Sequence, residues 1–525
     1  MMLKFAFVYA VLAVSSVCKA APAVDQVSVE TGQIKGAISG GVVSFKGIPF
    51  AAPPEGNNRW RAPQPAERWD GVRSVTEYGP DCMQLPFPSD AAPLGTKPSE
   101  DCLYLNVWAP VERPGPRLPV MVWIYGGGFV NGGSSPAVYD GTHFAERGVV
   151  FVSFNYRLAR FGFFAHPALT KENPSGPLGN YGYMDQIAAL KWVQQNIAQF
   201  GGDPANVTLF GESAGGGSVL TLLTSPMSRG LFQKAIIESG GGRTGLIPMH
   251  RIHDPAPDLP SAEAVGVAFA KEAGITGEDE AALAALRNLP AERVVNGLNM
   301  ASMGVQGQTY SGPMLDGQIL TETPEAALIA GHESKMPVIA GANSSDIGFS
   351  RAKTFDELFA SFGADQKKAQ AAYNPENSTD VRAISALVAA DRMMIEPARF
   401  VVRMMTAAGQ PSYEYRFSYV AESMRNEWHG APHATEIPFV FDTVQARYGT
   451  KLAARDEATG RAANTYWVNF AKTGNPNGNG LPTWPQYDPQ RDVLLDFTAA
   501  GPVAKPDPWR TRLDLTGTLA EHASK

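Results

Sequence analysis

A serine flanked by glycines is the feature of this sequence that most directly suggests chemistry. Ser213 lies at the centre of Gly211-Glu212-Ser213-Ala214-Gly215, after the apolar run 207–210 and before a segment, 216–223, that can form a helix. Glycines two positions before and after the serine let a strand and a helix approach closely, because a Cβ at either position would clash. The pattern predicts a strand, a strained turn and a helix that expose the hydroxyl of Ser213 as a nucleophile.

A second glycine cluster, Gly126-Gly127-Gly128, follows the apolar run 119–124, which we expect to be a buried strand. A serine nucleophile needs a base, a group that orients the base, and donors for the developing oxyanion. Backbone N–H groups of Gly127, Gly128 and Ala214 are expected to form a three-donor oxyanion hole. No Gly-Lys-Ser/Thr follows the cluster, which excludes a Walker-type phosphate loop.

Several further segments, in one order along the chain, resemble the type B carboxylesterase family, which includes the cholinesterases and the fungal lipases. The segments are FKGIPFAAPP at 45–54, SEDCLYLN at 99–106, the glycine cluster, NYR at 155–157, FGGDP at 200–204 with the serine motif, and WPQY at 484–487. The resemblance covers nearly the whole mature chain. It implies an α/β-hydrolase fold, with a large, mostly parallel central sheet, helices on both faces and a helical cap region. It also implies ester hydrolysis through an acyl-enzyme, with no metal and no cofactor.

The base is expected to be one of eight histidines. In an α/β-hydrolase the histidine follows the serine and the acid along the chain, which excludes His143 and His166. His433 lies in the segment 430–439, which resembles the family's catalytic-histidine segment, and we expect it to be the base. His429, four residues earlier, is the closest alternative.

The orienting acid is expected at Asp346, shortly after the apolar run 338–340, because the family places its acid there, usually as a glutamate. Aspartate is one methylene shorter, about 1.5 Å of reach. The loop that carries Asp346 must therefore lie closer to His433, or another acid must serve. Asp316 is the alternative acid, although its surroundings resemble a structural motif of the family.

The resemblance also implies supporting residues. Ser239 matches a family serine that hydrogen-bonds near the acid, and Glu212 either adds negative potential beside the nucleophile or is a buried structural glutamate. Two ion pairs are expected, Arg157 with Asp185 and Lys46 with Glu100. The second should be loose, because lysine cannot form the bidentate fork of the family's usual arginine.

The composition and the N-terminal segment limit the number of domains, the class of partner and the cellular location. The 525 residues would suit three or four domains, but the motifs extend over one catalytic unit, so we expect a single domain at 21–525. A net charge of −7 without basic runs argues against nucleic acid and anionic membrane surfaces as partners. Residues 1–20 are typical of a signal peptide, with Lys4 before an apolar run too short to span a bilayer. Cleavage after Ala23 is the alternative.

The predicted signal implies a secreted or periplasmic protein without a membrane anchor. Cleavage removes Cys18 and leaves Cys82 and Cys102, which are expected to pair in an oxidising compartment and which match the family's first disulfide.

The remaining pattern predicts helices alternating with strands. An amphipathic helix is expected at 186–199 and a buried strand at 149–154. The segments 261–300 and 354–408 are expected to form the helical cap, with Ser261 and Thr354 as N-caps.

The substrate is expected to be a small-molecule ester. Residues 83–101, inside the expected disulfide loop, contain no tryptophan to hold a choline group by cation–π attraction, and their prolines do not suit an amphipathic lipase lid. Basic residues after Ser239 (Arg243, His250, Arg251 and His253) leave two readings open, an anionic substrate or a solvated loop. A non-catalytic adhesion module on the same fold is the alternative function, and both a monomer and a dimer are compatible with the sequence.

Overall fold

The computed structural model describes residues 24–87, 91–112, 115, 117–243 and 249–523. The predicted signal segment 1–20 and both predicted cleavage positions lie outside these residues. Among the residues described, no helix is both long enough and apolar enough to cross a bilayer.

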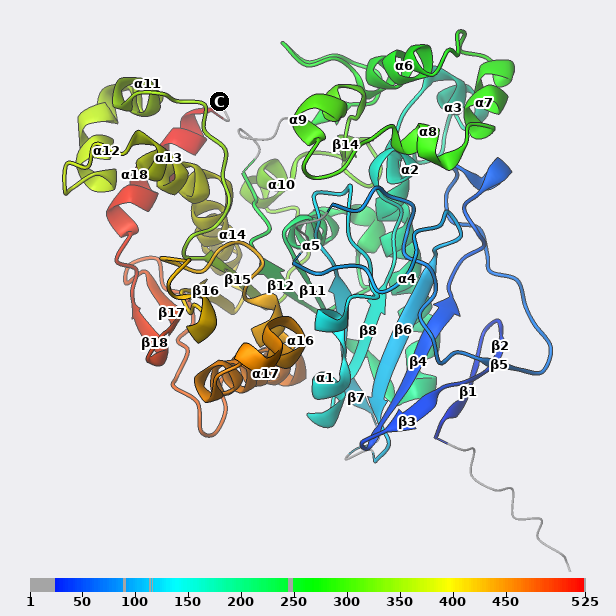
Figure 1. Cartoon of the computed structure of the whole chain (residues 1–525), viewed down its shortest axis with the longest axis horizontal. Helices are drawn as coiled ribbons and strands as arrows, with labels where there is room; N and C mark the ends of the chain where they lie inside the picture. Colours follow the sequence, from blue (N-terminus) through cyan, green and yellow to red (C-terminus); the bar gives the residue numbers. More distant parts are fainter. Residues whose placement is uncertain (1–23, 88–90, 113–114, 116, 244–248, 524–525) are drawn as a thin grey trace, which may run out of the picture.

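A mixed sheet of eleven strands forms the centre of the molecule (Figure 1), in the order β18-β17-β16-β15-β12-β11-β7-β8-β6-β4-β3. All neighbours from β17 to β8 pair in parallel, whereas the strands beyond them at both edges pair antiparallel. In chain order the strands are β3 (Ala37–Ser39), β4 (Val42–Pro49), β6 (Tyr104–Pro110), β7 (Leu118–Ile124), β8 (Val150–Phe154), β11 (Gly202–Glu212), β12 (Lys234–Glu238), β15 (Val338–Asn343), β16 (Ser412–Phe417), β17 (Val493–Thr498) and β18 (Gly501–Pro506).

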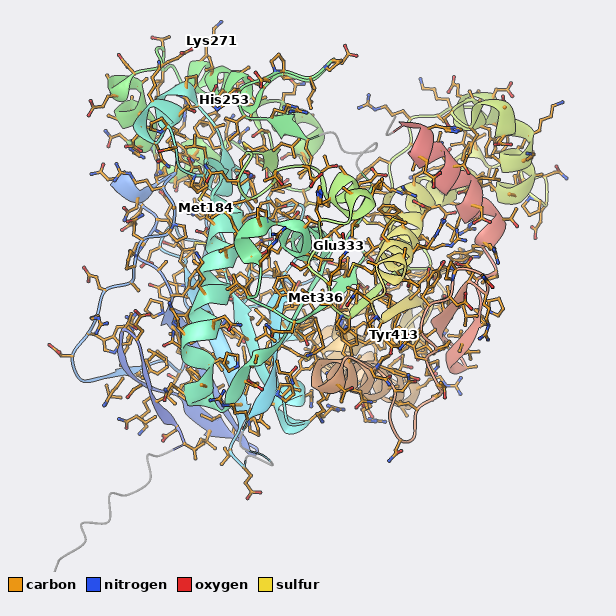
Figure 2. All side chains as sticks on the ribbon, turned by 180° about the vertical axis from the view of Figure 1, so that it is seen from behind. Met184, His253, Lys271, Glu333, Met336 and Tyr413 are labelled. Carbon is orange, nitrogen blue, oxygen red and sulfur yellow. A yellow bond between two sulfur atoms is a disulfide. The ribbon has the colours of Figure 1, made fainter. Side chains whose placement is uncertain are left out.

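The central strands are apolar on both faces because helices cover both faces. Every residue of β8 is buried, and β7 is a nearly continuous apolar run. Helices α1 (Thr142–Glu146) and α17 (Ala454–Thr473) lie in front of the sheet in Figure 1, and α4 (Tyr181–Asn196), which carries the labelled Met184, lies in front in the reverse view of Figure 2. The predicted α/β arrangement with a mostly parallel centre is confirmed.

The helix predicted at 186–199 differs from the prediction in its start and in its exposure. It begins at Tyr181, continues from Asn196 into a 3-10 turn, η3 (Ile197–Phe200), and ends at Gly201, whose φ is +85°. Twelve of its sixteen residues are buried. The expected amphipathic pattern is wrong because α2 (Ala159–Gly162) and β9 (Phe163–Phe164) also pack on this helix, away from the sheet.

The predicted cap segments form two clusters of helices at the top of the molecule in Figure 1. The first contains α6 (Ala262–Glu272), α7 (Glu280–Arg287), α8 (Ala291–Val295) and α9 (Met303–Gln306); the second contains α11 (Phe355–Ala360), α12 (Gln366–Tyr373), α13 (Val381–Ala390), a π-helical turn η7 (Asp391–Ile395) and α14 (Glu396–Ala407). Both predicted N-caps are confirmed: the hydroxyl of Ser261 accepts from the N–H of Ala264 at 3.2 Å, and that of Thr354 accepts from the N–H of Glu357 at 3.1 Å. The C-terminal helix α18 (Arg510–Ala523) joins the second cluster.

One of the two predicted ion pairs forms. Arg157 binds both carboxylate oxygens of Asp185 at 2.8 Å, in a buried position. The pairing of Lys46 with Glu100 is wrong. Arg59 binds Glu100 instead, with Nε 2.8 Å from Oε2 and Nη2 on the other oxygen, because its planar fork matches the carboxylate. The ammonium of Lys46 lies 4.6 Å from the centre of the Tyr78 ring.

Cys82 and Cys102 are joined by a disulfide, as expected. Gln84, just inside the loop that this bond closes, contacts Gly132, four residues after the glycine cluster. Its side chain donates to the carbonyl of Gly132 at 2.6 Å and accepts from the N–H of Gly132 at 3.0 Å. The disulfide loop is therefore attached to the segment that follows β7.

Candidate active site

The backbone around Ser213 has the strained turn that the glycines predicted. Ser213 joins β11 to α5 (Ala214–Thr224) with φ +55° and ψ −122°, a conformation that side chains rarely adopt. Its N–H donates to the carbonyl of Glu238 at 2.9 Å. A Cβ on Gly211 would lie 2.6 Å from the carbonyl oxygen of Ile124, and one on Gly215 would lie closer still. Strand and helix can meet at this angle only because both positions lack side chains.

Ser213, His433 and Asp346 form one hydrogen-bonded row. The Nε2 atom of His433 lies 2.8 Å from the hydroxyl of Ser213, and its Nδ1 atom lies 2.6 Å from Oδ1 of Asp346. The serine follows β11, the aspartate follows β15, and the histidine lies between β16 and the short helix α15 (Ile437–Val440). The three side chains meet beyond the carboxyl ends of the parallel strands, where open α/β sheets bind their ligands.

The loop of Asp346 is attached to the segment just before His433. Ser345 donates its backbone N–H to the carbonyl of Ala431 at 2.9 Å, and the side chain of Asn343 donates to the carbonyl of Pro432 at 2.6 Å. These bonds hold the two loops side by side, so the shorter aspartate reaches the imidazole.

Asp346 is buried and fully hydrogen-bonded. Its Oδ2 accepts from the hydroxyl of Ser239 at 2.7 Å and from the N–H of Asn343 at 2.9 Å, and its Oδ1 accepts from the N–H of Ile347 at 2.7 Å. Burial alone would raise the pKa of Asp346, but the charge of His433 and these hydrogen bonds lower it below its usual value. The carboxyl group is therefore ionised beside the imidazole.

The alternative residues lie elsewhere. Asp316 accepts three backbone hydrogen bonds from its own turn, from Gln318, Ile319 and Leu320, at 2.8–3.0 Å. The side chain of His429 is exposed to solvent. The structure brings together Asp346 and His433 and leaves Asp316 in a structural turn.

The glycine cluster lies directly beside Ser213. A Cβ on Gly126 would come within 2.9 Å of the Cβ of Ser213. Gly127 and Gly128 have φ values of +101° and +62°, and the carbonyl of Gly127 accepts from the N–H of Asn131 at 2.9 Å. Over the part of the chain that the structure describes, no acceptor binds the N–H of Gly127, Gly128 or Ala214. These three N–H groups are therefore not engaged in backbone hydrogen bonds among those residues.

Glu212 contacts the same histidine from the other side. Its Oε1 lies 3.2 Å from Nε2 of His433. Burial raises the pKa of Glu212 well above its ordinary value, with smaller contributions from the charges of Glu436 and Asp346. The imidazole of His433 thus lies between two carboxyl groups.

Two further buried glutamates, which sequence reasoning missed, lie close to this row. Glu238 is the register partner of Glu212 in the neighbouring strand, and its Oε1 accepts from the indole of Trp467 at 2.7 Å. Glu436 accepts a hydrogen bond from the side chain of Asn343. Their only sequence signal is adjacency: Glu238 precedes Ser239, and Glu436 follows His433 by three residues.

The acidic groups around His433 change its pKa. Burial favours the neutral imidazole, but the charges of Glu212 and Asp346 and the hydrogen bond to Asp346 outweigh it and raise the pKa of His433 above its usual value. The imidazolium that forms when the histidine accepts a proton is therefore stabilised.

Two of the basic residues that raised the possibility of an anionic substrate, Arg243 and His253, pair with glutamates. Arg243 is buried, donates to Glu396 and to Glu325, and lies 3.8 Å over the ring of Phe400. His253 pairs with Glu263 at 3.0 Å, and Figure 2 shows it in the outer helical cluster near Lys271. The interpretation of Arg243 as a residue of a solvated loop is wrong, because the side chain is buried and pairs with Glu325 and Glu396.

Comparisons with known proteins agree with this geometry. Residues 23–507 match the Carboxylesterase family. The chain is 35% identical to a fumonisin B1 esterase of Sphingopyxis macrogoltabida, over 90% of this chain and 86% of that protein. It is 36% identical to a para-nitrobenzyl esterase of Bacillus subtilis (strain 168), over 89% of this chain and 94% of that protein. A solved structure of PNB esterase has a TM-score of 0.79 at 33% identity and covers 93% of this chain and 99% of its own.

The match extends over the central sheet, both groups of covering helices and the loops that carry the serine, aspartate and histidine. The fold is therefore the α/β-hydrolase fold implied by the sequence. The chain is also more than 30% identical, over most of its length and theirs, to proteins named as esterases. The comparisons therefore support the activity as well as the fold. This chain belongs to the carboxylesterase family and is a carboxylic ester hydrolase.

Proposed function

We propose that this enzyme hydrolyses its ester through a covalent acyl-enzyme on Ser213, with His433 as general base and Asp346 as the acid that orients it. The observation that supports this assignment most strongly is the continuous row of hydrogen bonds from Asp346 through both nitrogens of His433 to the serine hydroxyl.

The first half of the reaction forms the acyl-enzyme. His433 accepts the proton of Ser213 while the serine oxygen attacks the ester carbonyl carbon. The carbonyl oxygen becomes an oxyanion held by the N–H groups of Gly127, Gly128 and Ala214. The tetrahedral intermediate then collapses, the imidazolium donates its proton to the departing alcohol, and the acyl group stays on Ser213.

The second half releases the acid. His433 accepts a proton from a water molecule, whose oxygen attacks the acyl carbon, and the second oxyanion occupies the same three donors. Collapse of this intermediate returns the proton to Ser213. Asp346 stays ionised throughout, fixes the tautomer with hydrogen on Nδ1, and stabilises the imidazolium.

Glu212 and Ser239 act through their neighbours. Ser239 donates to the Oδ2 atom of Asp346 and so holds the carboxylate with its other oxygen toward His433. Glu212, 3.2 Å from Nε2, adds negative potential where the imidazolium forms.

The substrate is proposed to be a small, uncharged ester. The names of the two relatives state different esters, fumonisin B1 in one and a para-nitrobenzyl ester in the other. Arg243 was a candidate for binding an anionic group of the substrate. Its guanidinium is paired with Glu325 and Glu396, so it does not favour an anionic ester. A choline ester is disfavoured because residues 83–101 contain no tryptophan.

The alternative, a non-catalytic adhesion module, would lack one or more residues of the row. Here all three are present and in contact, which favours catalysis. We also propose that residues 21–525 act as one exported catalytic domain after cleavage of the signal 1–20; the disulfide Cys82–Cys102 supports an oxidising compartment.

A covalent probe tests the assignment of the nucleophile. Purified protein is expected to hydrolyse p-nitrophenyl acetate and to be labelled by a fluorophosphonate at Ser213, as located by peptide mass spectrometry. The Ser213→Ala variant should lose both properties, and heat-denatured protein should not be labelled. Labelling of another serine in the native protein, or full activity of Ser213→Ala, would reject the assignment.

A further inference from the structure

A methionine of the cap lies directly on one of the oxyanion-hole glycines. The space where a Cβ of Gly128 would project is filled by the sulfur of Met300, with the methyl carbon of Met303 3.2 Å from that position. The backbone N–H of Met300 donates to the side-chain oxygen of Asn131 at 2.9 Å, on the same loop. The sulfur therefore touches the glycine while the backbone of the same residue is bound to the loop.

The segment that carries Met300 has little room to withdraw. Leu298 is fully buried against Val130 and Ala159. The side chain of Asn131, besides accepting from Met300, donates to the carbonyl of Leu85 at 2.8 Å. The backbone of Met300 is therefore held against this loop, which keeps the sulfur close to Gly128.

Oxidation would change both the size and the polarity of this contact. A peroxide transfers one oxygen atom to the thioether sulfur: its O–O bond breaks, an S–O bond forms, and the other oxygen leaves as water, so the sulfur loses two electrons and the peroxide gains them. The product is a sulfoxide, larger than the thioether and a strong hydrogen-bond acceptor. Met300 is only partly buried, so a molecule as small as hydrogen peroxide can reach it.

We propose that Met300 is an oxidation-sensitive site of this enzyme, at which formation of the sulfoxide lowers ester hydrolysis reversibly. The sulfoxide oxygen would compete with the substrate oxyanion for the N–H of Gly128 and crowd the same space. The inference rests on the proposed role of Gly128 as an oxyanion donor.

The test follows activity and oxidation together. Enzyme treated with millimolar hydrogen peroxide is assayed with p-nitrophenyl acetate, and the sulfoxide at each methionine is quantified by peptide mass spectrometry. We expect a loss of about tenfold in kcat/KM that follows oxidation of Met300, less than the roughly 10²–10³ that loss of an oxyanion donor costs. Methionine sulfoxide reductases A and B, driven by thioredoxin, should restore the activity.

Variants locate the effect. Met300→Leu keeps an apolar side chain without sulfur, and its rate after peroxide should stay within about twofold of its own untreated rate. Met227→Leu is the matched control: Met227 is 36% exposed on the turn η4 (Pro226–Ser228), outside the active site, and this variant should be as sensitive as the parent. Thioredoxin without the reductases controls for reduction of the disulfide Cys82–Cys102.

Three outcomes would overturn the proposal: full activity in enzyme whose Met300 is fully oxidised, equal sensitivity of Met300→Leu, or protection by Met303→Leu alone. The proposed nucleophile is tested separately by untreated Ser213→Ala, because activity in that variant would reject the acyl-enzyme mechanism whatever the peroxide results.

Discussion

The surroundings of His433 shift the pKa of its imidazole away from that of a histidine in a peptide. A histidine in a peptide has a pKa of about 6.5, and a histidine base in ordinary surroundings would give activity that rises near that pH. In the structure the imidazole lies between Asp346 at Nδ1 and Glu212 at Nε2, and these charges raise its pKa despite burial. The midpoint of activity should therefore lie above the reference value, because Glu212 at the end of β11 and Asp346 after β15 both lie beside the imidazole.

The pH profile tests this conclusion. In its proposed role as general base His433 acts only when neutral, so a raised pKa moves the rise of kcat/KM to a pH above about 6.5. Glu212→Gln removes a carboxyl group that favours the imidazolium when it is ionised, so the profile of this variant should move to lower pH. Rates measured from pH 5 to 10 with p-nitrophenyl acetate, corrected for spontaneous hydrolysis, give both midpoints. A parent midpoint at or below 6.5, or a shift of Glu212→Gln to higher pH, would contradict the account.

The identity of the acid is tested by a pair of isosteric variants. Asp346→Asn keeps the shape of the residue but favours the wrong tautomer of His433, and should lower kcat by about 10⁴ while the fold stays intact. Asp316→Asn alters a carboxylate that accepts hydrogen bonds from the backbone of its own turn, so it should reduce stability and leave kcat close to that of the parent. Circular dichroism provides the check on folding. Near-full activity of Asp346→Asn together with loss in Asp316→Asn would reverse the assignment.

At the scale of elements, local patterns were predictable and tertiary surroundings were not. The turn at Ser213 could be predicted because its glycines act within five residues of sequence. The exposure of helix α4 could not be predicted, because α2 and β9 cover the side of the helix that faces away from the sheet. The pairing of Glu100 with Arg59 was not predicted, because the two residues are 41 positions apart in the sequence and meet only in the folded chain.

The close contact of β11 and α5 makes a sharp prediction about two glycines. A Cβ at Gly215 would collide with the backbone carbonyl of Ile124, whereas one at Gly217, in the same helix, would have only a 3.4 Å contact, with Gly240. Gly215→Ala should therefore destabilise the protein by about 1–3 kcal/mol or more. Gly217→Ala should be neutral or stabilise by up to about 1 kcal/mol, since alanine is the better helix former. Urea denaturation measures both, and equal effects of the two variants would contradict the packing argument.

At the scale of the whole molecule, the order of motifs along the chain carried most of the information. Asp346 and His433 are 87 residues apart and were assigned by their place in a family order, not by local pattern. Glu238 and Glu436 were missed, because their proximity to Glu212 arises from the pairing of β11 with β12 and from the crossing of separate loops. Long-range neighbours of this kind exist only once the sheet is assembled.

The loop closed by the disulfide contacts the segment that follows the glycine cluster. The bond Cys82–Cys102 closes a loop of sequence separation 20, and Gln84 within that loop holds Gly132, next to the glycine cluster. Closing a loop of this length should stabilise the fold by about 3 kcal/mol through the entropy of the unfolded chain.

We therefore expect the double variant Cys82→Ala/Cys102→Ala to unfold at lower denaturant concentration, with a loss of about 3 kcal/mol in the free energy of unfolding. Gln84→Ala, which keeps the disulfide but removes the contacts to Gly132, should lower kcat/KM more than it lowers stability, because the glycine loop loses a support. Peptide mapping without reductant first establishes that the two cysteines are linked in exported protein. Free thiols there, or a double variant as stable as the parent, would show that the bond does not stabilise the molecule.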